Sequence, residues 1–410
     1  MVRIVFTLVL FSIILFLDFY IWNAFKSDIN SAFVKWLYWI VSILSLFSIL
    51  YPAINTNMTL YPGYMVVLFG LVFSVFAAKI IAIMPLFIDD IIRVFKFVSR
   101  YFIDSGASIS GEKINRLDFF KRSAMVLGAF TLTTLTYGIL VGRFDFKKHF
   151  VNLKLKNFKS KNPLKIVQLS DMHLGSFQRV DKLEEAVELI NDEKPDLIFF
   201  TGDLVNNHAD EAYPFIDTLS KLKAKYGKFS VLGNHDYADY IGLDLSTEEG
   251  RNAWQKNHNE IIDIHQKFGF DLLLNENKQI ELGDQLINIV GVENWGDGRF
   301  SKYGDIKKAM NDVVDGVTTF LLSHDPTHWQ NKVLKHDQKV DLQLSGHTHG
   351  MQFGIEIGGI RWSPSQWKYK YWAGLYNTGD NFLYVNRGIG HLGYPGRVGI
   401  LPEITVLNIS

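Results

Sequence analysis

Two histidines, His347 and His349, lie two residues apart in a turn that follows the short apolar run 340–344. Neutral imidazole is the commonest nitrogen ligand of transition metals, so a His-x-His turn could hold one ion or two neighbouring ions. Most His-x-His pairs are ordinary loop residues, however. This pair therefore indicates a metal site only if other segments of the chain supply further ligands.

Four upstream segments end an apolar, strand-like run with a similar polar turn: 171–173, 202–203, 233–236 and 323–325. In open sheets, ligands lie beyond the carboxyl ends of the strands, where several loops converge. We therefore expect the five turns to form one site. The predicted metal ligands are Asp171, His173, Asp203, Asn234, His324, His347 and His349.

The number and chemistry of these ligands indicate which ions they would hold. Three oxygen-donating and four nitrogen-donating side chains are too many for one ion with an open position, but they suit two ions about 3.5–4 Å apart. Mixed oxygen and imidazole donors favour manganese, iron or zinc over calcium or magnesium. We predict two divalent ions, with manganese preferred. A thiolate site is excluded because the chain has no cysteine.

The region 150–410 must position these turns, and its pattern predicts how. Apolar runs such as Leu164–Leu169 and Leu197–Phe200 alternate with amphipathic helical segments, which is typical of a buried, largely parallel sheet. Gln279–Leu282 and Gln285–Val292 flank a Gly-Asp turn and predict a hairpin. We predict an α/β domain of two packed, mostly parallel or mixed sheets flanked by helices.

Residues 1–149 have a different composition, dominated by long apolar runs without a polar face. Each run approaches the ~20 residues that a helix needs to cross a hydrocarbon core. We predict about four transmembrane helices, at 2–25, 32–53, 64–88 and 123–141.

The ordered series of motifs, over roughly Leu164–Ser410, resembles the calcineurin-like metallophosphoesterase superfamily. The apolar N-terminal region and the glycine-rich run 385–404 resemble its membrane-anchored bacterial branch. The resemblance implies a hydrolase in which a metal-activated water cleaves a phosphoester or pyrophosphate bond. It implies that Asp203 bridges the two ions, that His235 acts as general acid or transition-state stabiliser, and that Asp236 orients His235. The ligands that it implies for the first ion are Asp171, His173, Asp203 and His349, and those for the second are Asp203, Asn234, His324 and His347.

Some proteins of that branch are similar to hydrolases of a nucleotide-linked diacylglucosamine, so the substrate could be lipid-linked. A general phosphodiesterase and a protein phosphatase are alternatives, and a catalytically silent membrane scaffold or sensor is an alternative of another class. No nucleic-acid partner is expected, because 42 basic and 42 acidic residues balance and no motif supplies a basic track.

Four further residues are candidates for contact with the substrate. Arg387 and Arg397 are suited to phosphate, although buried structural arginines are an equal alternative. His208 could line the substrate mouth. Met351 replaces a glycine that the branch usually has after the paired histidines, and could alter substrate fit. The aromatic segment 362–376 is expected either to pack in the core or to lie at a membrane surface.

Basic residues in short loops predict membrane orientation, because such loops stay in the cytoplasm. The segment 93–122 has seven basic residues and the segment 52–63 has no charged residue. We therefore predict a multi-pass protein of the bacterial cytoplasmic membrane with an extracytoplasmic catalytic domain. Five basic residues after the fourth apolar run favour the opposite orientation: Arg143, Lys147, Lys148, Lys154 and Lys156. Large domains, however, translocate largely regardless of charge.

Overall fold

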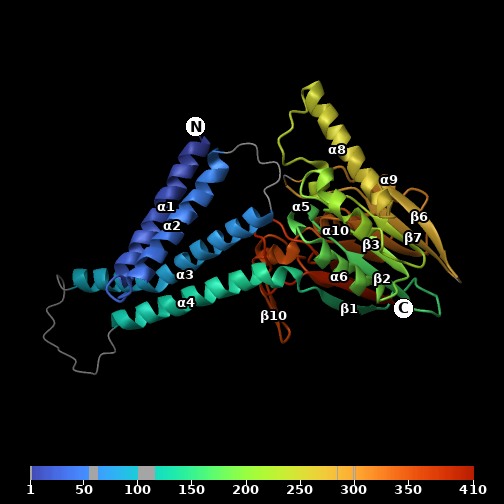
Figure 1. Ribbon diagram of the computed structural model, residues 1–410. Coiled ribbons are helices and arrows are strands. Elements are labelled where there is room, and N and C mark those ends of the chain that lie inside the picture. The colour runs from blue at the N-terminus through green and yellow to red at the C-terminus, as the bar shows by residue number, and fades with distance from the viewer. Residues whose placement is uncertain (1, 55–62, 100–115, 284, 299, 301) are drawn as a thin grey trace. The chain divides into compact units, whose positions relative to one another are not determined.

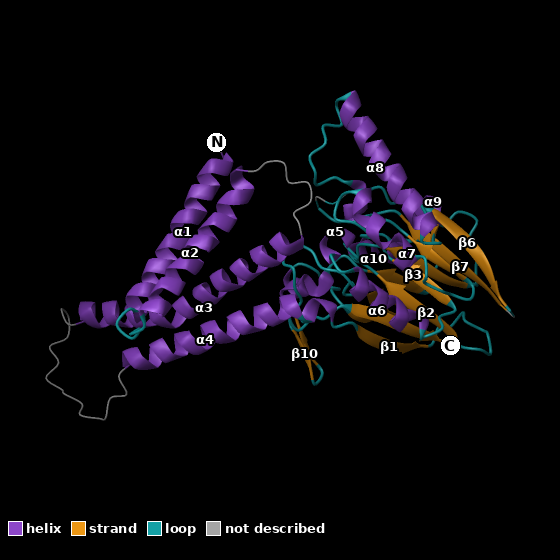
Figure 2. Ribbon diagram, in the orientation of Figure 1, coloured by secondary structure: helices purple, strands orange, loops and turns teal. Residues whose placement is uncertain are grey.

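The chain forms two compact units, Met1–Leu140 and Val141–Ser410. The computed structural model describes residues 2–54, 63–99, 116–283, 285–298, 300 and 302–410. Within these residues the first unit is helical and the strands belong to the second unit (Figures 1 and 2).

The described part of the first unit contains four helices: α1 (Val2–Phe25), α2 (Ala32–Ile54), α3 (Gly63–Ser99) and α4 (Arg116–Leu140). Three described stretches are long and apolar enough to cross a membrane, namely Leu8–Phe25, Tyr64–Ser99 and Arg116–Phe144, while Ala32–Phe47 is a shorter apolar helix. Helix α3 continues past the predicted end at residue 88, and α4 begins before residue 123. The orientation was predicted from the segments 52–63 and 93–122. Residues 55–62 of the first and 100–115 of the second lie outside the described residues.

A charged pair joins three of these apolar helices. Lys79 of α3 forms an ion pair with Asp18 of α1 and donates a hydrogen bond to Ser42 Oγ of α2 at 3.0 Å. The hydroxyl of Tyr38 in α2 donates to the Asp18 carbonyl oxygen at 2.7 Å. Because an unpaired charge is costly in a hydrocarbon layer, this network explains how the otherwise apolar helices tolerate Asp18 and Lys79.

The second unit is built on two six-stranded sheets. The first has the strand order β1-β14-β2-β3-β4-β5, and only β14 and β2 pair antiparallel. Its strands are β1 (Lys147–Leu153), β14 (Glu403–Ile409), β2 (Leu164–Leu169), β3 (Leu197–Phe200), β4 (Gly227–Ser230) and β5 (Asp271–Leu272).

The second sheet has the order β12-β13-β9-β8-β7-β6, with parallel pairing at its centre and an antiparallel pair at each edge. Its strands are β12 (Gly374–Thr378), β13 (Asn381–Val385), β9 (Leu342–Ser345), β8 (Thr318–Ser323), β7 (Gln285–Val292) and β6 (Glu276–Leu282). The predicted hairpin is confirmed as β6–β7. A separate small hairpin consists of β10 (Ile355–Ile357) and β11 (Ile360–Trp362).

The two sheets pack face to face, because one buried cluster contains Ile166 and Phe199 of the first sheet with Phe320 and Leu344 of the second. Helices cover both outer faces. Those on the first sheet are α6 (Val180–Asn191), α7 (Ile216–Leu219) and α8 (Glu248–Lys267), and those on the second are α9 (Ile306–Ala309) and α10 (Thr327–Asn331). The predicted fold class is therefore confirmed. The remaining short helices are α5 (Leu174–Phe177) and the 3₁₀ segments Gly142–Phe144, Ala209–Phe215, Asn234–Tyr237, Val333–Lys335, His349–Gln352 and Pro364–Trp367.

The aromatic segment 362–376 divides between buried and exposed positions. Tyr369 and Trp372 are buried in a small cluster with Ile400, whereas Trp362 and Trp367 are exposed. The core expectation therefore holds for only part of the segment, and the membrane-surface expectation stays a prediction.

Candidate metal centre

The seven predicted ligands lie just beyond the carboxyl ends of five strands. Asp171 and His173 follow β2, Asp203 follows β3, and Asn234 follows β4. In the second sheet, His324 follows β8, while His347 and His349 follow β9. Parallel strands end at a common edge, so each loop delivers its side chain to the same end of the two sheets.

The turns that carry these ligands are strained. Asp171, His173, Asp203, His347 and His349 have φ values of 52°, 46°, 58°, 72° and 50°. A left-handed backbone conformation costs about 1–3 kcal/mol for each residue other than glycine, and this conformation persists only where the surrounding structure imposes it. The conformation turns each strand end sharply, so that the side chain points back towards the other loops.

Two glycines allow the loops to approach one another. A Cβ atom at Gly346 would collide with Ser170 Oγ and Asp171 Oδ2, and one at Gly233 would collide with Asp203 Oδ1. The loop after β9 therefore sits directly against the loop after β2, and the loop after β4 against Asp203. Any larger residue at these positions would push the ligands apart.

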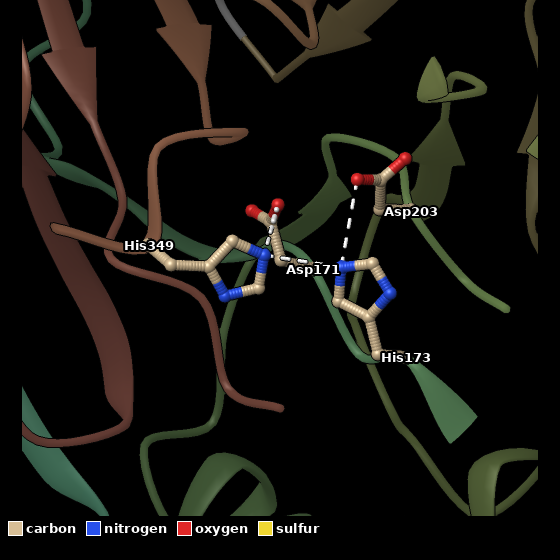
Figure 3. A group of neighbouring side chains, drawn as sticks. All are labelled: Asp171, His173, Asp203 and His349. Atoms are coloured by element: carbon tan, nitrogen blue, oxygen red, sulfur yellow. Dashed lines mark hydrogen bonds and ion pairs between the residues drawn. The ribbon is translucent and has the colours of Figure 1, made fainter. Parts of the chain in front are cut away.

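Four ligands form the first group: Asp171, His173, Asp203 and His349 (Figure 3). The Nε2 atom of His349 lies 3.1 Å from Asp171 Oδ1 and 3.0 Å from His173 Nε2. His173 Nε2 in turn lies 3.5 Å from Asp203 Oδ2. Two imidazole nitrogens and two carboxylates thus face a common point.

The second group contains Asp203, His324 and His347. His324 Nε2 lies 3.1 Å from Asp203 Oδ2 and 3.3 Å from His347 Nδ1. Asn234 Oδ1 lies 2.7 Å from the same Nδ1 atom, so the amide oxygen joins this group. All seven predicted ligands are therefore brought together, and Asp203 belongs to both groups.

Hydrogen bonds on the far sides of the rings select the nitrogen that each histidine presents. His324 Nδ1 lies 2.7 Å from the Thr201 carbonyl oxygen, which can only accept, so this nitrogen carries the proton and Nε2 faces the group. His347 has the opposite arrangement, because its Nε2 contacts the Tyr369 hydroxyl at 2.9 Å and Nδ1 faces the group.

The buried charges of the centre suit a divalent cation. Burial raises the pKa values of Asp171 and Asp203, but the neighbouring imidazoles, His349 and His324 above all, outweigh it and hold both pKa values well below the usual range. Burial lowers the pKa of His324, yet Asp203 outweighs this effect and raises that pKa to about 10. The carboxylates are therefore ionised, and a metal cation competes with protons for the same lone pairs. This buried, oxygen- and imidazole-rich set fits manganese, iron or zinc.

His235 and Asp236 differ from expectation in how they are connected. The Nδ1–H group of His235 donates to the Asn206 carbonyl oxygen at 2.7 Å, so Asn206 orients the ring. Asp236 accepts hydrogen bonds from the backbone N–H groups of Asp203, Leu204, Val205 and Gly233. Its task is therefore to tie the loop after β3 to the loop after β4, which corrects the prediction that it orients His235.

Two tyrosines beside the centre were not predicted. The Tyr240 hydroxyl accepts a hydrogen bond from Asn234 Nδ2 at 2.8 Å, which turns the amide oxygen towards His347, and its ring lies 4.6 Å from that of His235. Tyr369 contacts His347 from the opposite side. The only sequence signal for Tyr240 was its position shortly after His235, which many loop tyrosines share, and Tyr369 lies too far along the chain from the paired histidines to carry even that signal.

Both predicted substrate arginines are buried and bonded within the protein. Arg387 pairs with Glu403 at 2.5 Å and with Glu356 at 2.6 Å. Arg397 donates to the carbonyl oxygens of Gly390 and Arg387. Both arginines are therefore structural residues rather than phosphate ligands. His208 is half-buried and its N–H donates to Glu211, so its role at the substrate mouth remains a prediction.

Met351 adopts the left-handed conformation, with φ of 49°, and is exposed. This conformation favours glycine, which explains why the branch usually has a glycine at this position. The methionine therefore adds an apolar side chain to the surface beside His349.

Two packed sheets with a buried Asp/His centre at their strand ends define a metal-dependent hydrolase. Residues 2–143 match the family model "Probable Calcineurin-like phosphoesterase, transmembrane domain", and residues 164–351 match "Calcineurin-like phosphoesterase". The chain belongs to the calcineurin-like metallophosphoesterase family and carries a transmembrane region, as its motifs indicated.

Relatives span bacteria and vertebrates. "Uncharacterized metallophosphoesterase YkuE" of Bacillus subtilis is 31% identical over 313 residues, which cover 73% of this chain and 99% of the relative. "Transmembrane protein with metallophosphoesterase domain" of Danio rerio is 27% identical and covers 81% of this chain and 71% of its own length. "Phosphodiesterase YaeI" of Escherichia coli is 30% identical, covering 65% and 89% respectively.

Proposed function

We propose that the chain hydrolyses a phosphoester or pyrophosphate bond at a centre of two divalent ions, with manganese preferred. The observation that carries this proposal is the sharing of Asp203 between the two ligand groups. A shared carboxylate is the arrangement expected for two ions about 3.5–4 Å apart. The proposed ligands of the first ion are Asp171, His173, Asp203 and His349, and those of the second are Asp203, Asn234, His324 and His347.

When bound, the ions supply charge neutralisation of the phosphate oxygens and lower the pKa of a water molecule. The P–O bond to the leaving group breaks as the water oxygen bonds to phosphorus. In the proposed reaction His235 donates a proton to the leaving oxygen from Nε2, because its Nδ1–H is engaged by the Asn206 carbonyl oxygen. This role requires the imidazolium, in which both ring nitrogens carry a proton. The His235 backbone N–H donates to Asp203 Oδ1 at 2.8 Å, which fixes the residue beside the centre.

We propose a lipid-linked substrate. The catalytic unit begins at Val141, immediately after the last residue of α4, so the chain itself tethers the catalytic unit to the transmembrane region. A general phosphodiesterase is the second candidate, because the Escherichia coli relative is named a phosphodiesterase.

The experiment uses full-length protein in lipid nanodiscs. A chelator first removes bound metal from the protein, and Mn²⁺ is then titrated in. We expect hydrolysis of bis-p-nitrophenyl phosphate to appear as bound manganese approaches two ions per chain by elemental analysis, and to disappear again on chelation. Full activity at one ion per chain would contradict the two-ion proposal. The same nanodiscs are then given a lipid-linked phosphodiester and, separately, its water-soluble head group. Equal rates of hydrolysis for the two substrates would favour the general phosphodiesterase.

We further propose that the protein lies in a bacterial cytoplasmic membrane with the catalytic unit outside. Three of the basic residues that opposed this orientation belong to the folded domain: Arg143 is buried, and Lys147 and Lys148 pair with Asp145 and Glu193. The orientation of such a large domain depends little on its own charge. A C-terminal alkaline phosphatase fusion is expected to be active in cells, and a matched green fluorescent protein fusion dark. The reverse pair of results would place the domain in the cytoplasm.

A further inference from the structure

The small hairpin β10–β11 has one apolar face and one charged face. Its register pairs Ile355 with Trp362 and Ile357 with Ile360. Cross-strand partners, and residues two apart in one strand, share a face of the hairpin. These four apolar side chains therefore lie on one side. The pair between them, Glu356 and Arg361, lies on the other side.

The charged face is directed towards the protein. Glu356 forms an ion pair with the buried Arg387 at 2.6 Å, and Arg387 continues to Glu403 of β14. The Arg361 guanidinium lies over the ring of Trp372, 5.4 Å from its centroid. The hairpin is thus attached to the domain through its polar side chains.

The apolar face is directed away from the protein. Ile357 and Ile360 are 75% and 68% exposed, and Ile355 and Trp362 are also exposed. Trp367 is 76% exposed and its ring lies 6.0 Å from that of Trp362, which extends the same surface. A water-facing hairpin normally has the reverse arrangement, with apolar residues inward. Contiguous exposed apolar residues of this kind mark a partner or membrane surface.

The root of the hairpin lies beside the point where the chain enters the domain from α4. Gly354, directly before β10, donates its N–H to the Val398 carbonyl oxygen at 2.9 Å. The neighbouring Arg397 carbonyl oxygen packs so closely against Gly142 that a Cβ there would collide with it. Gly142 lies within the apolar stretch Arg116–Phe144, which is long enough to cross a membrane. A short chain of contacts therefore links the hairpin root to the C-terminal end of this apolar stretch.

We propose that the apolar face of β10–β11, together with Trp367, inserts into the head-group region of the bilayer that holds the transmembrane helices. Figure 2 shows the hairpin projecting away from the two large sheets, as such insertion requires. Two exposed lysines, Lys368 and Lys370, lie within three residues after Trp367 and would meet lipid phosphates. Tryptophan with adjacent lysine is typical of membrane–water interfaces. The proposal concerns binding only and does not depend on the proposed reaction.

The absence of cysteine makes the test direct, because a single introduced thiol can be labelled in the full-length chain. Ile357→Cys and Ile360→Cys would each carry an environment-sensitive NBD fluorophore, with the protein reconstituted in phosphatidylcholine–phosphatidylglycerol vesicles. The matched control is Val314→Cys, an exposed apolar residue before β8, at the end of that strand opposite His324. Doxyl-labelled lipid quenches probes in the bilayer, and iodide quenches probes in water.

We expect doxyl lipid to remove more than half of the emission at positions 357 and 360, while iodide has little effect. The control at 314 should show the opposite pattern. Quenching by iodide at 357 and 360 would overturn the proposal, since the face would then lie in water. Protection from both quenchers would also overturn it, because a second protein copy, rather than lipid, would cover the face.

Discussion

Replacing Asp203 by alanine is expected to abolish hydrolysis, with a loss of roughly 10³-fold or more in kcat/KM. The side chain lies 3.1 Å from His324 and 3.5 Å from His173, so its removal takes one oxygen ligand from each group. Loss of correctly held ions forfeits several kcal/mol of transition-state stabilisation, and ~4 kcal/mol corresponds to a factor of about 10³. We expect both the activity and the bound manganese, measured by elemental analysis, to fall together.

The matched control for this variant is Asp341→Asn. Asp341 is also buried, but it accepts a hydrogen bond from the Thr319 N–H at the start of β8, at the opposite end of the sheet from the centre. This variant should keep two ions per chain and normal turnover even if it loses some stability. If Asp203→Ala retained two ions and full activity, the bridging role of Asp203 would be wrong.

Sheet topology explains why the site could be predicted from sequence. The run before Asp203, Leu197–Phe200, is continuously apolar, and the strands before Asp171 and His324 are buried along almost their whole length, which is typical of strands covered on both faces. Buried parallel strands bring their carboxyl ends to one edge, so residues far apart in sequence had to meet there. The fold class and the ligand cluster both follow from this single rule.

Contacts that depend on side-chain direction could not be predicted in the same way. Arg387, just after β13, pairs with Glu403, which lies sixteen residues later in β14 of the other sheet. From residue type alone, the same guanidinium would suit a phosphate equally well. The tautomer of His235 depends on the Asn206 carbonyl oxygen, and a backbone atom leaves no mark in the sequence. The face of the hairpin on which Ile357 lies follows only from the register of β10 and β11.

The structure also separates the two roles at the turn after β4, and this separation can be measured. Replacing His235 by alanine is expected to leave both ions bound but to lower kcat by about 10²–10⁴-fold, the usual contribution of a general acid. The metal ligands should survive because Asp203 Oδ1 is held by the backbone N–H of residue 235, which alanine retains. Elemental analysis and steady-state kinetics on the same sample test both halves of this expectation.

The leaving group distinguishes proton donation from a merely structural role for His235. p-Nitrophenolate leaves readily without a proton, whereas an alkoxide does not, so the His235→Ala defect should be much larger for a phosphodiester with an alkyl leaving group. Tyr240→Phe is the matched control: it keeps the ring beside His235 but removes the hydroxyl that accepts from Asn234, so it should weaken metal binding without this leaving-group dependence. An equal loss for both leaving groups in His235→Ala, together with loss of manganese, would make His235 a residue that shapes the centre rather than one that donates a proton.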